Sequence, residues 1–307
     1  MQRIAAIDLG TNTCNLLIAD IVDNKLHTIK TERRIVKLLE TKTTNGSISN
    51  NAIKRCVNAF IDYKKIIDSS NTHNLIALAT SGLRNAPNQS LIIQEIYNKT
   101  EIKPQIINGK TEANLIFKGV SHLIESKSEI NLLLDIGGGS NEFIAFNYKN
   151  MLFSFSFDVG IARVLNMFKF SDPLSENDIN TLEKLFKNTF LPLIEKSKDI
   201  KYSTLIGSSG TFETLASVFN EFSGNKHNNN FKTNIPINDF NIISKNILSK
   251  TIGERKLIQG MDLMRVEMIP IAVVLVQFVL KTFNIKQITY SKYSLKEGVI
   301  IDKYINK

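Results

Sequence analysis

The chain has 307 residues, 43% of them hydrophobic and 22% charged, a composition typical of a folded globular protein long enough for two domains. Its formal net charge of +9 favours anionic partners, but charge alone does not separate nucleic acid from smaller polyanions. Two cysteines and four dispersed histidines exclude a disulfide framework and the spacing of a zinc site. No segment has the roughly 18 apolar residues that span a bilayer, and the strongest candidate, 268–280, predicts a core helix.

The surroundings and partners of the chain follow from the same features. The N-terminus enters an apolar strand directly, without the long apolar segment of a signal peptide. Few cysteines fit a reducing compartment. We therefore expect a cytoplasmic protein. No nucleic-acid-binding motif accompanies the positive charge, so neither nucleic acid nor a membrane is an expected partner, and a homodimer is one assembly that the sequence allows.

The first part of the chain predicts strands followed by alternating helices and strands. Alternating or continuous apolar runs predict strands at 3–9, 15–21, 26–38, 75–80 and 105–108. Helical periodicity and N-terminal signals predict helices at 49–67, 91–97 and 111–125.

The same plan restarts after a polar stretch at 126–129. Strands are expected at 131–136, 142–147, 151–158, 204–207 and 287–291. Helices are expected at 177–194, 211–222, 239–248, 264–281 and 295–305, and an exposed loop at 223–234. Each half opens with three successive strands, which predicts a duplicated α/β architecture. We place the first lobe at 1–125 and the second at 126–294, with the final helix, about 295–307, able to pack back onto the first.

Two similar turns, one near the start of each half, are the sharpest local features. The first, 8–13, reads Asp-Leu-Gly-Thr-Asn-Thr, and the second, 135–142, reads Asp-Ile-Gly-Gly-Gly-Ser-Asn-Glu. Glycines let backbone N–H groups approach phosphate oxygens, and Ser and Thr add hydroxyl donors. The Asp can hold a hydrated Mg²⁺ through one oxygen. Ordinary β-hairpin turns have a similar composition, but two matched copies favour a phosphate clamp.

A third loop, 205–211, follows a predicted strand and precedes a predicted helix. It reads Leu-Ile-Gly-Ser-Ser-Gly-Thr. Free N–H groups and the helix dipole make such a position a good anion site, for which Gly210 and Thr211 are the candidate residues. Ser209 or Thr211 also fits an ordinary N-cap, and the two interpretations are compatible.

With these loops in order, the chain resembles the exopolyphosphatase and guanosine-pentaphosphate phosphohydrolase family, within the superfamily of actin, the heat-shock chaperone ATPases and the sugar kinases. The resemblance runs from Ile4 to about Ile301. Beyond the turns, it is carried by Ala-Thr-Ser-Gly-Leu-Arg-Asn-Ala at 79–86, Ile-Asn-Gly-Lys-Thr-Glu-Ala at 107–113, Asp-Val-Gly-Ile-Ala-Arg at 158–163, Gly-Met-Asp-Leu-Met-Arg at 260–265 and Leu-Lys-Glu-Gly-Val at 295–299. Asn141 stands where Thr is usual in that family.

The resemblance implies an α/β fold of two ribonuclease-H-like lobes around a central cleft, with phosphates bound between the two turns. It implies that Glu112 is the base that activates water, and that Asp135 and Glu142 bind Mg²⁺ or Mn²⁺ with Asp8 as an outer partner. The phosphate-binding candidates, including those of the third loop, are Thr11, Asn12, Thr13, Arg84, Gly138, Gly139, Ser140, Gly210 and Thr211. Without the resemblance, Glu112 is an acid favoured at a helix N-terminus, and Arg84 is a solvated turn residue.

The leading hypothesis for function is an exopolyphosphatase that releases orthophosphate from the end of inorganic polyphosphate by metal-assisted water attack. A guanosine-pentaphosphate 5′-phosphohydrolase is the close alternative, because both substrates end in a phosphoanhydride. A non-catalytic sensor of polyphosphate or alarmone is less favoured, since the base and the metal-binding acids are retained. A sugar-kinase-like phosphotransferase would share the fold but is expected to lack the 109–113 segment.

Overall fold

The structure is a computed structural model and describes residues 2–40, 46–72, 74–124, 129–224 and 231–305. The chain divides into two compact units. The first unit comprises Met1–Gly119 and Ser294–Lys307, and the second comprises Val120–Tyr293. The lobe boundary predicted between residues 125 and 126 lies outside the described residues. Each unit has a sheet of its own, and each is described here by itself.

The first unit is built on a five-stranded sheet in the order β3-β2-β1-β4-β5. Its strands are β1 (Gln2–Leu9), β2 (Thr13–Val22), β3 (Lys25–Ile35), β4 (Asn74–Ala79) and β5 (Gln105–Ile106). The first three form an antiparallel meander, whereas β4 pairs parallel to β1 and β5 parallel to β4. The parallel strands require crossovers, and helices supply them.

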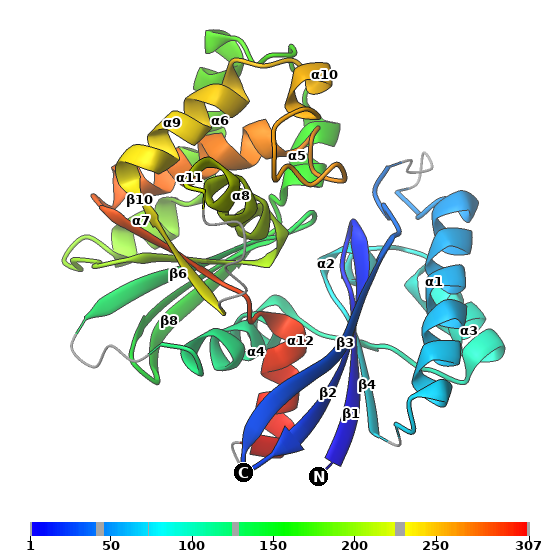
Figure 1. The fold of residues 1–307 in the computed structure, drawn as a ribbon. Helices are drawn as coiled ribbons and strands as arrows, with labels where there is room; N and C mark the ends of the chain where they lie inside the picture. Colours follow the sequence, from blue (N-terminus) through cyan, green and yellow to red (C-terminus); the bar gives the residue numbers. More distant parts are fainter. Residues whose placement is uncertain (1, 41–45, 73, 125–128, 225–230, 306–307) are drawn as a thin grey trace. The chain divides into compact units, whose positions relative to one another are not determined.

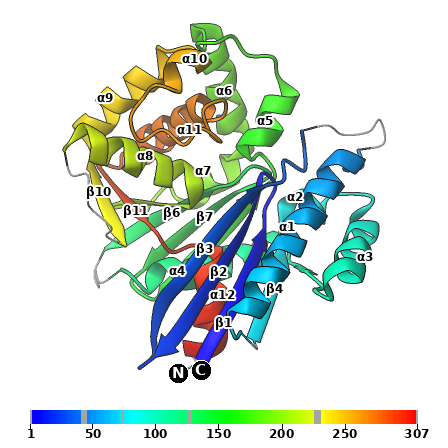
Figure 2. The same ribbon diagram turned by 45° about the vertical axis from the view of Figure 1, so that its right-hand side comes forward.

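Helices cover both faces of this sheet. They are α1 (Asn50–Ser69), α2 (Ser81–Arg84), α3 (Gln89–Thr100), α4 (Gly109–Ser121) and α12 (Leu295–Ile300), the last continued by a π-helical turn at Ile301–Ile305. Figures 1 and 2 show α1 and α3 on one face and α4 and α12 on the other. Ser49 caps α1 by accepting a hydrogen bond from the amide of Ala52, as its sequence predicts. Helix α12 is part of the first unit although it lies almost at the end of the chain.

Helices α4 and α12 touch where both carry glycine. A Cβ on Gly298 would overlap the Leu115 carbonyl, so the α12 backbone lies directly against α4. An ion pair between Lys118 and Asp302 spans the same two segments. Since α4 also carries Glu112, the packing of α12 helps to fix where that carboxylate lies.

The second unit repeats the strand plan of the first and extends it. Its sheet has the order β10-β11-β9-β6-β7-β8. The strands are β6 (Ile130–Ile136), β7 (Asn141–Asn147), β8 (Asn150–Phe157), β9 (Leu205–Ser208), β10 (Lys232–Pro236) and β11 (Gln287–Ser291). As in the first unit, three antiparallel strands are followed by parallel ones, with β9 beside β6 and β11 beside β9. The additional strand, β10, pairs antiparallel to β11.

Strand β8 contains a bulge. The pairing of β8 with β7 shifts register between Ala145 and Phe146, so Leu152 is one residue more than the partner strand has. Beyond the bulge, Phe155 stands opposite Phe143. Phe157 packs edge to face on Phe143, with ring centroids 5.9 Å apart. Phe153, Phe155 and Phe157 therefore face the core of this unit.

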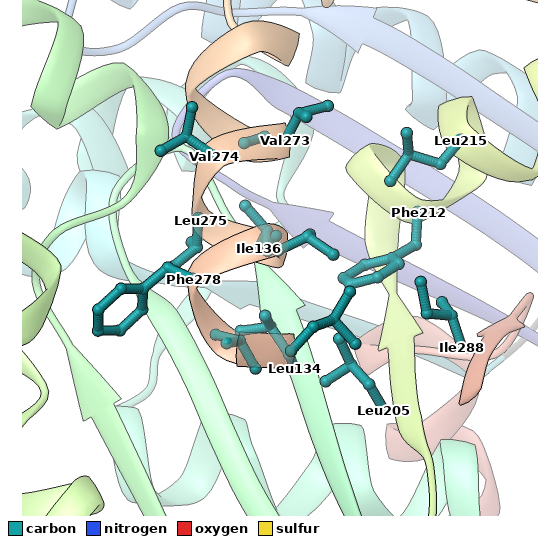
Figure 3. Close-up of a cluster of buried hydrophobic side chains, with 14 of the residues drawn as sticks. Leu134, Ile136, Leu205, Phe212, Leu215, Val273, Val274, Leu275, Phe278 and Ile288 are labelled. Carbon is teal, nitrogen blue, oxygen red and sulfur yellow. The ribbon is translucent and has the colours of Figure 1, made fainter. Parts of the chain in front are cut away.

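The helices of the second unit are α5 (Ile161–Met167), α6 (Glu176–Thr189), α7 (Leu191–Lys196), α8 (Ser209–Phe222), α9 (Ile237–Leu248), α10 (Ile252–Arg255) and α11 (Ile269–Thr282). Most of them pack over one face of its sheet. Figure 3 shows side chains of α8 and α11 meeting Leu134 and Ile136 of β6 in this core. The predicted core helix at 268–280 is confirmed, because α11 is buried along almost its whole length. Within the part of the chain that the structure describes, no helix has the length and apolar character to cross a bilayer.

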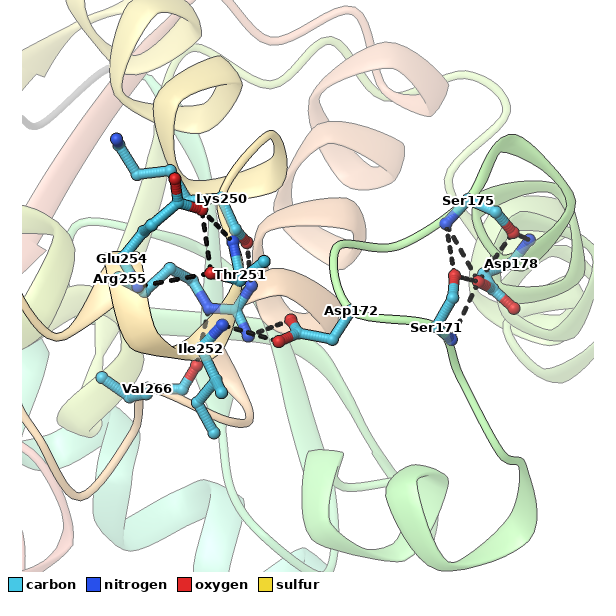
Figure 4. A network of polar contacts seen from close by, with 10 residues as sticks. All are labelled: Ser171, Asp172, Ser175, Asp178, Lys250, Thr251, Ile252, Glu254, Arg255 and Val266. Atoms are coloured by element: carbon cyan, nitrogen blue, oxygen red, sulfur yellow. Dashed lines mark hydrogen bonds and ion pairs between the residues drawn. The ribbon is translucent and has the colours of Figure 1, made fainter.

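A polar network ties the loop between α5 and α6 to α10 (Figure 4). Arg255 is 3% exposed and donates to Asp172 at 2.7 Å and to the Val266 carbonyl at 2.9 Å. On the same loop, the hydroxyls of Ser171 and Ser175 donate to Asp178. A capping box starts α6, because Ser175 N donates to Asp178 Oδ2 at 2.9 Å and Asp178 N donates to Ser175 Oγ at 3.2 Å. The hydroxyl of Ser171 is the main cause that lowers the pKa of Asp178 to about 2.

Several predicted elements need correction. The helix expected at 177–194 is two helices, α6 and α7, which meet at Phe190. The long helix expected from 264 begins at Ile269, just before Pro270, which suits a first helical turn. Part of the expected loop 223–234 is strand β10, and residues 225–230 lie outside the described residues. The short helices α2, α5 and α10 were not predicted, because four to seven residues do not establish a periodicity.

Candidate functional site

The first acidic turn joins β1 to β2, so the hairpin interpretation is correct for its geometry. Gly10 donates its N–H to the Thr13 carbonyl at 2.9 Å. The carbonyls of Thr11 and Asn12 accept backbone hydrogen bonds of 2.7–3.1 Å from residues 36–38. In a trans peptide the C=O and the next N–H point in opposite directions. The amides of Asn12 and Thr13 therefore point away from residues 36–38, as donors to an anion would.

Helix α2 brings Arg84 to the same turn. A Cβ on Gly82 would lie 2.8 Å from Thr11 Cα, so the start of α2 is packed directly against the turn. Two residues later, Arg84 Nη1 donates to the Ile107 carbonyl at 2.8 Å and to Glu112 Oε2 at 3.0 Å. The interpretation of Arg84 as a solvated turn residue is wrong, because its side chain is largely buried in this ion pair. The first unit thus pairs Arg84 with Glu112 and packs Gly82, two residues before Arg84, against the Thr11 turn.

Glu112 lies in the first turn of α4, as its sequence predicts. Asn108 precedes the helix and caps it, since Thr111 N donates to Asn108 Oδ1 at 2.8 Å and Glu112 N to the Asn108 carbonyl at 2.9 Å. Glu112 is only 7% exposed. A buried carboxylate is costly unless it is paired, and both the helix N-terminus and Arg84 stabilise its negative charge. The result is a buried carboxylate that Arg84 holds in one place.

The second acidic turn repeats the geometry of the first. Gly137 donates its N–H to the Ser140 carbonyl at 3.0 Å. Here α5 takes the role that residues 36–38 have in the first unit. The backbone N–H groups of Ile161 and Arg163 and the Arg163 guanidinium donate to the carbonyls of 137–139 at 3.0–3.1 Å. By the same peptide geometry, the amides of 138–140 point away from α5.

Close backbone contact holds α5 in that place. Gly160 is the N-cap of α5, and a Cβ there would overlap the backbone of Gly138 and Gly139. Asn141, which is fully buried, donates from Nδ2 to the Val159 carbonyl at 2.9 Å. The departure from Thr at position 141 thus supplies an anchor for the residues that lead into α5.

The two metal candidates of the second unit face each other across β6 and β7. Asp135 and Glu142 are register partners, and they are 5% and 1% exposed. Directly opposite residues on antiparallel strands lie on the same face with Cβ atoms about 5 Å apart. Ser208 of β9 is the register partner of Asp135, and Ser156 of β8 that of Glu142. The sheet therefore carries an acid-and-serine row across four strands: Ser208, Asp135, Glu142 and Ser156.

Serine hydroxyls bind both acids of this row. Ser208 donates to Asp135 Oδ2 at 2.6 Å, and Ser156 donates to Glu142 Oε1 at 2.8 Å. Ser140, predicted as a phosphate donor, gives its hydroxyl to Glu142 Oε1 at 2.7 Å. Sequence reasoning assigned no role to Ser156 or Ser208, because their contacts depend on strand register.

The third loop also serves Asp135. Helix α8 begins at Ser209, and Ser208 is its N-cap without a side-chain capping bond. The N-cap interpretation of Ser209 or Thr211 is therefore wrong. Ser209 instead donates its hydroxyl to Asp135 Oδ2 at 2.6 Å and has a positive φ of 64°. Thr211 is buried within α8.

Other side chains fill the space that the two glycines of the third loop leave open. A Cβ on Gly207 would overlap the Phe212 ring, and one on Gly210 would overlap the Arg265 guanidinium. Arg265 also forms an ion pair with Asp262 at 3.4 Å. A cation thus lies against Gly210, one of the predicted anion-binding residues. The segment 260–265 carried part of the resemblance, but the role of Arg265 emerges only from this contact.

The acid-and-serine row fits a hard divalent cation. Two buried carboxylates directly opposite each other repel, and a cation between their oxygens would relieve that cost. Mg²⁺ is usually held by one or two carboxylates together with waters and substrate phosphates. No group of three or more His, Cys, Asp or Glu side chains able to hold a metal occurs among the described residues. Asp8, in β1 of the first unit opposite Asn15, stays a predicted outer partner.

Both units share the strand order of a three-stranded meander followed by parallel strands, and each opens with an acidic glycine hairpin. Solved structures place this duplicated arrangement in the actin-like ATPase fold. An exopolyphosphatase from Cytophaga hutchinsonii superposes with a TM-score of 0.94 at 36% identity, over 97% of this chain and 96% of that one. The Aquifex aeolicus PPX-GPPA enzyme has a TM-score of 0.80 at 21% identity, over 98% and 99% of the two chains, which shows the shared fold.

Residues 17–307 match the model of the Ppx/GppA phosphatase family, and the chain belongs to that family. A putative exopolyphosphatase of Haemophilus influenzae is 28% identical over 98% of this chain and 91% of its own length. A bifunctional 3-dehydroquinate synthase/phosphatase of Fusobacterium nucleatum is 36% identical over 70% of this chain. That match spans about a third of the Fusobacterium protein, 34% of its length.

Proposed function

We propose that this protein is an exopolyphosphatase, which releases orthophosphate from the end of inorganic polyphosphate by attack of water. The observation that carries the proposal is the Arg84–Glu112 pair, which holds a buried carboxylate in the unit that contains the Thr11 turn. Membership in the Ppx/GppA phosphatase family supports hydrolysis of phosphoanhydrides. The similarity to the Cytophaga exopolyphosphatase over nearly the whole of both chains supports polyphosphate as the substrate.

Glu112 is the proposed general base. The phosphoryl transition state is loose, so positioning the water and accepting its proton matter more than strong basicity. Arg84 holds Glu112 Oε2 and keeps the carboxylate in one orientation. Its proposed second role is to stabilise negative phosphate oxygens as a cation.

The two acidic turns are the proposed phosphate-binding elements of their units. In the first turn, the amides of Asn12 and Thr13 point away from the carbonyl contacts that fix the turn. In the second turn, the amides of 138–140 point away from the contacts with α5 in the same way. Such successive N–H groups form an anion-binding concavity. The third loop contributes Gly210 and Thr211 to this proposal, with the Arg265 guanidinium beside Gly210.

Asp135 and Glu142 are the proposed ligands of Mg²⁺ or Mn²⁺. When bound, such an ion would neutralise phosphate charge and orient the terminal phosphoryl group. The serine hydroxyls on each acid hold the carboxylates in place on the sheet. Asp8 is the proposed outer partner.

The test is orthophosphate release by the purified chain from long polyphosphate, tripolyphosphate and guanosine pentaphosphate in parallel, each with Mg²⁺, Mn²⁺ or chelator. We expect the highest kcat/KM for polyphosphate and no release with chelator. A higher kcat/KM for guanosine pentaphosphate would reject polyphosphate as the main substrate. That outcome would agree with a Vibrio vulnificus guanosine-5′-triphosphate,3′-diphosphate pyrophosphatase, 29% identical over 70% of this chain and 43% of its own length.

Glu112→Gln tests the base. Glutamine keeps the shape and can still accept a hydrogen bond from Arg84, but it does not take up a proton. We expect kcat to fall at least tenfold, as general bases contribute roughly 10² to 10⁴, with polyphosphate binding retained. The control is Glu95→Gln, an exposed Glu of α3 in the same unit. Unchanged turnover in Glu112→Gln would refute the assignment, and binding without any turnover in the wild type would indicate a sensor.

A further inference from the structure

We infer that Ser156 and Ser209 are positioning residues for the metal-binding acids, and that their hydroxyls set the affinity of the second unit for a divalent cation. The inference rests on the proposed roles of Asp135 and Glu142 and goes beyond them. Both acids show the same pattern, because each receives two serine hydroxyls on a single carboxylate oxygen.

Ser156 reaches Glu142 only because of the bulge in β8. The extra residue, Leu152, shifts the register so that Ser156 stands opposite Glu142. Without the shift, the alternation of the strand would place Phe155 there. Ser156 is exposed, whereas its hydroxyl contacts an acid that is 1% exposed. A surface residue that serves a buried charge can be replaced without opening the core.

Ser209 reaches Asp135 through a backbone conformation that disfavours serine. Its φ of 64° lies in the left-handed region, where a Cβ crowds the backbone. Glycine is the residue that adopts this region without strain, yet the chain has serine. Strain of this kind persists where surrounding contacts determine it, and the contact here is the 2.6 Å hydrogen bond to Asp135 Oδ2. Ser208 already donates to the same Asp135 oxygen at 2.6 Å and so satisfies the buried charge. The second hydroxyl, from Ser209, therefore serves to fix the orientation of the Asp135 carboxylate.

Orientation matters here because the two acids face each other. Carboxylates in direct register repel, and rotation of either side chain away from its neighbour would relieve that repulsion and disperse the ligand oxygens. Two hydroxyls on one oxygen oppose that rotation. Groups that orient metal ligands from outside typically change metal affinity or activity 10- to 100-fold when they are removed. Simple solvation of buried charge would instead affect folding stability more than cation affinity.

The experiment measures Mn²⁺ binding to the full chain by electron paramagnetic resonance, without substrate, alongside the melting temperature. Mn²⁺ is the probe because it binds carboxylate sites and is paramagnetic. Ser156→Ala removes the hydroxyl, and Ser156→Thr keeps it on a β-branched residue suited to a strand. Ser154→Ala is the matched control, since Ser154 lies on the same face of β8 but opposite Ile144. Ser209→Gly removes a hydroxyl while it relieves the backbone strain.

We expect the Kd for Mn²⁺ to rise about tenfold in Ser156→Ala and in Ser209→Gly. Ser156→Thr and Ser154→Ala should stay within about twofold of the wild type, and the melting temperature of Ser209→Gly should be no lower. Unchanged Kd values in Ser156→Ala and Ser209→Gly would overturn the inference, provided that Asp135→Asn weakens binding. If the wild type does not bind Mn²⁺, or Asp135→Asn binds it equally well, the proposed metal site itself is wrong.

Discussion

Gly82→Ala tests whether the first turn and α2 form one rigid assembly. The Cβ of alanine would lie 2.8 Å from Thr11 Cα and 2.9 Å from Thr11 Oγ1, whereas ordinary contacts begin at 3.4 Å. The turn and the helix must therefore separate by about 0.6 Å, because the nearest atom belongs to the backbone and cannot rotate away. Gly82 itself has no positive φ, so the contact and not the backbone conformation requires glycine.

The size of the effect follows from that separation. Forcing an extra methyl group into a packed contact costs about 1–3 kcal/mol, and each kcal/mol lowers the Tm of a unit of this size by a few degrees. Displacement by 1 Å can cost about 100-fold in rate, so about 0.6 Å between Thr11 and the Arg84–Glu112 pair should cost roughly tenfold in kcat. The loss in rate should exceed what unfolding explains, because most of the protein remains folded at 25 °C.

The assay is phosphate release from polyphosphate at 25 °C, combined with thermal unfolding. Gly253→Ala is the matched control, since both glycines are the second residue of a four-residue helix and the nearest atom to a Cβ on Gly253 is 3.9 Å away. That variant should keep its Tm and its kcat. A Gly82→Ala protein with wild-type kcat and Tm would refute the coupling between the turn and α2.

Three further predictions follow from contacts elsewhere in the chain. Arg84→Met should leave the Glu112 carboxylate buried without the Arg84 cation, so we expect the free energy of unfolding, measured by urea titration, to fall by about 2–3 kcal/mol. The double variant with Glu112→Gln should regain most of that stability, and strictly additive losses of the two single variants would contradict the pairing. Gly298→Ala should lower the Tm by several degrees or prevent folding, because its Cβ would overlap the Leu115 carbonyl, and a wild-type melting curve would show that α12 moves freely over α4. The ionised Asp178 stabilises the folded wild type above about pH 4, and this stability is lost as the pH falls towards the folded pKa of Asp178, about 2. Asp178→Asn should therefore be less stable than the wild type at neutral pH by on the order of 1 kcal/mol after solvent screening. In urea titrations this difference in unfolding free energy should vanish at low pH, and a constant difference from pH 6 to pH 2 would argue against the lowered pKa.

The turns were predictable because their signals are local. Asp8 and Asp135 each follow an apolar run and precede Gly, and each lies next to the last residue of a strand in the structure. The orientation of the turn amides was not predictable, because it depends on carbonyl contacts with residues 36–38 and with α5. Helix α5 has only seven residues, too few to establish a helical periodicity.

The Arg84–Glu112 pair shows what separates a motif from a contact. The sequence marked both residues, but their association requires that β4 and β5 be parallel neighbours. The connections that leave two parallel neighbours start at the same edge of the sheet, so α2 and α4 begin close together. A parallel pairing of β4 with β5 therefore predicts that the two segments meet. The contact between Ser156 and Glu142 could not be predicted in this way, because it depends on a bulge that no residue type in β8 indicates.

The bulge at Leu152 also determines which chemistry each side of β8 presents. Phenylalanines at 153, 155 and 157 alternate with serines at 154 and 156, so one side of the strand is aromatic and the other carries hydroxyls. If Leu152 instead paired regularly with Ala145, the bulge would be lost and the two sides of the strand would be exchanged relative to β7. Rings would then stand beside the acids, and hydroxyls would enter the aromatic cluster. A one-residue shift in the pairing of β8 would therefore damage both folding and the proposed metal site, whereas most single substitutions in β8 would damage only one of them.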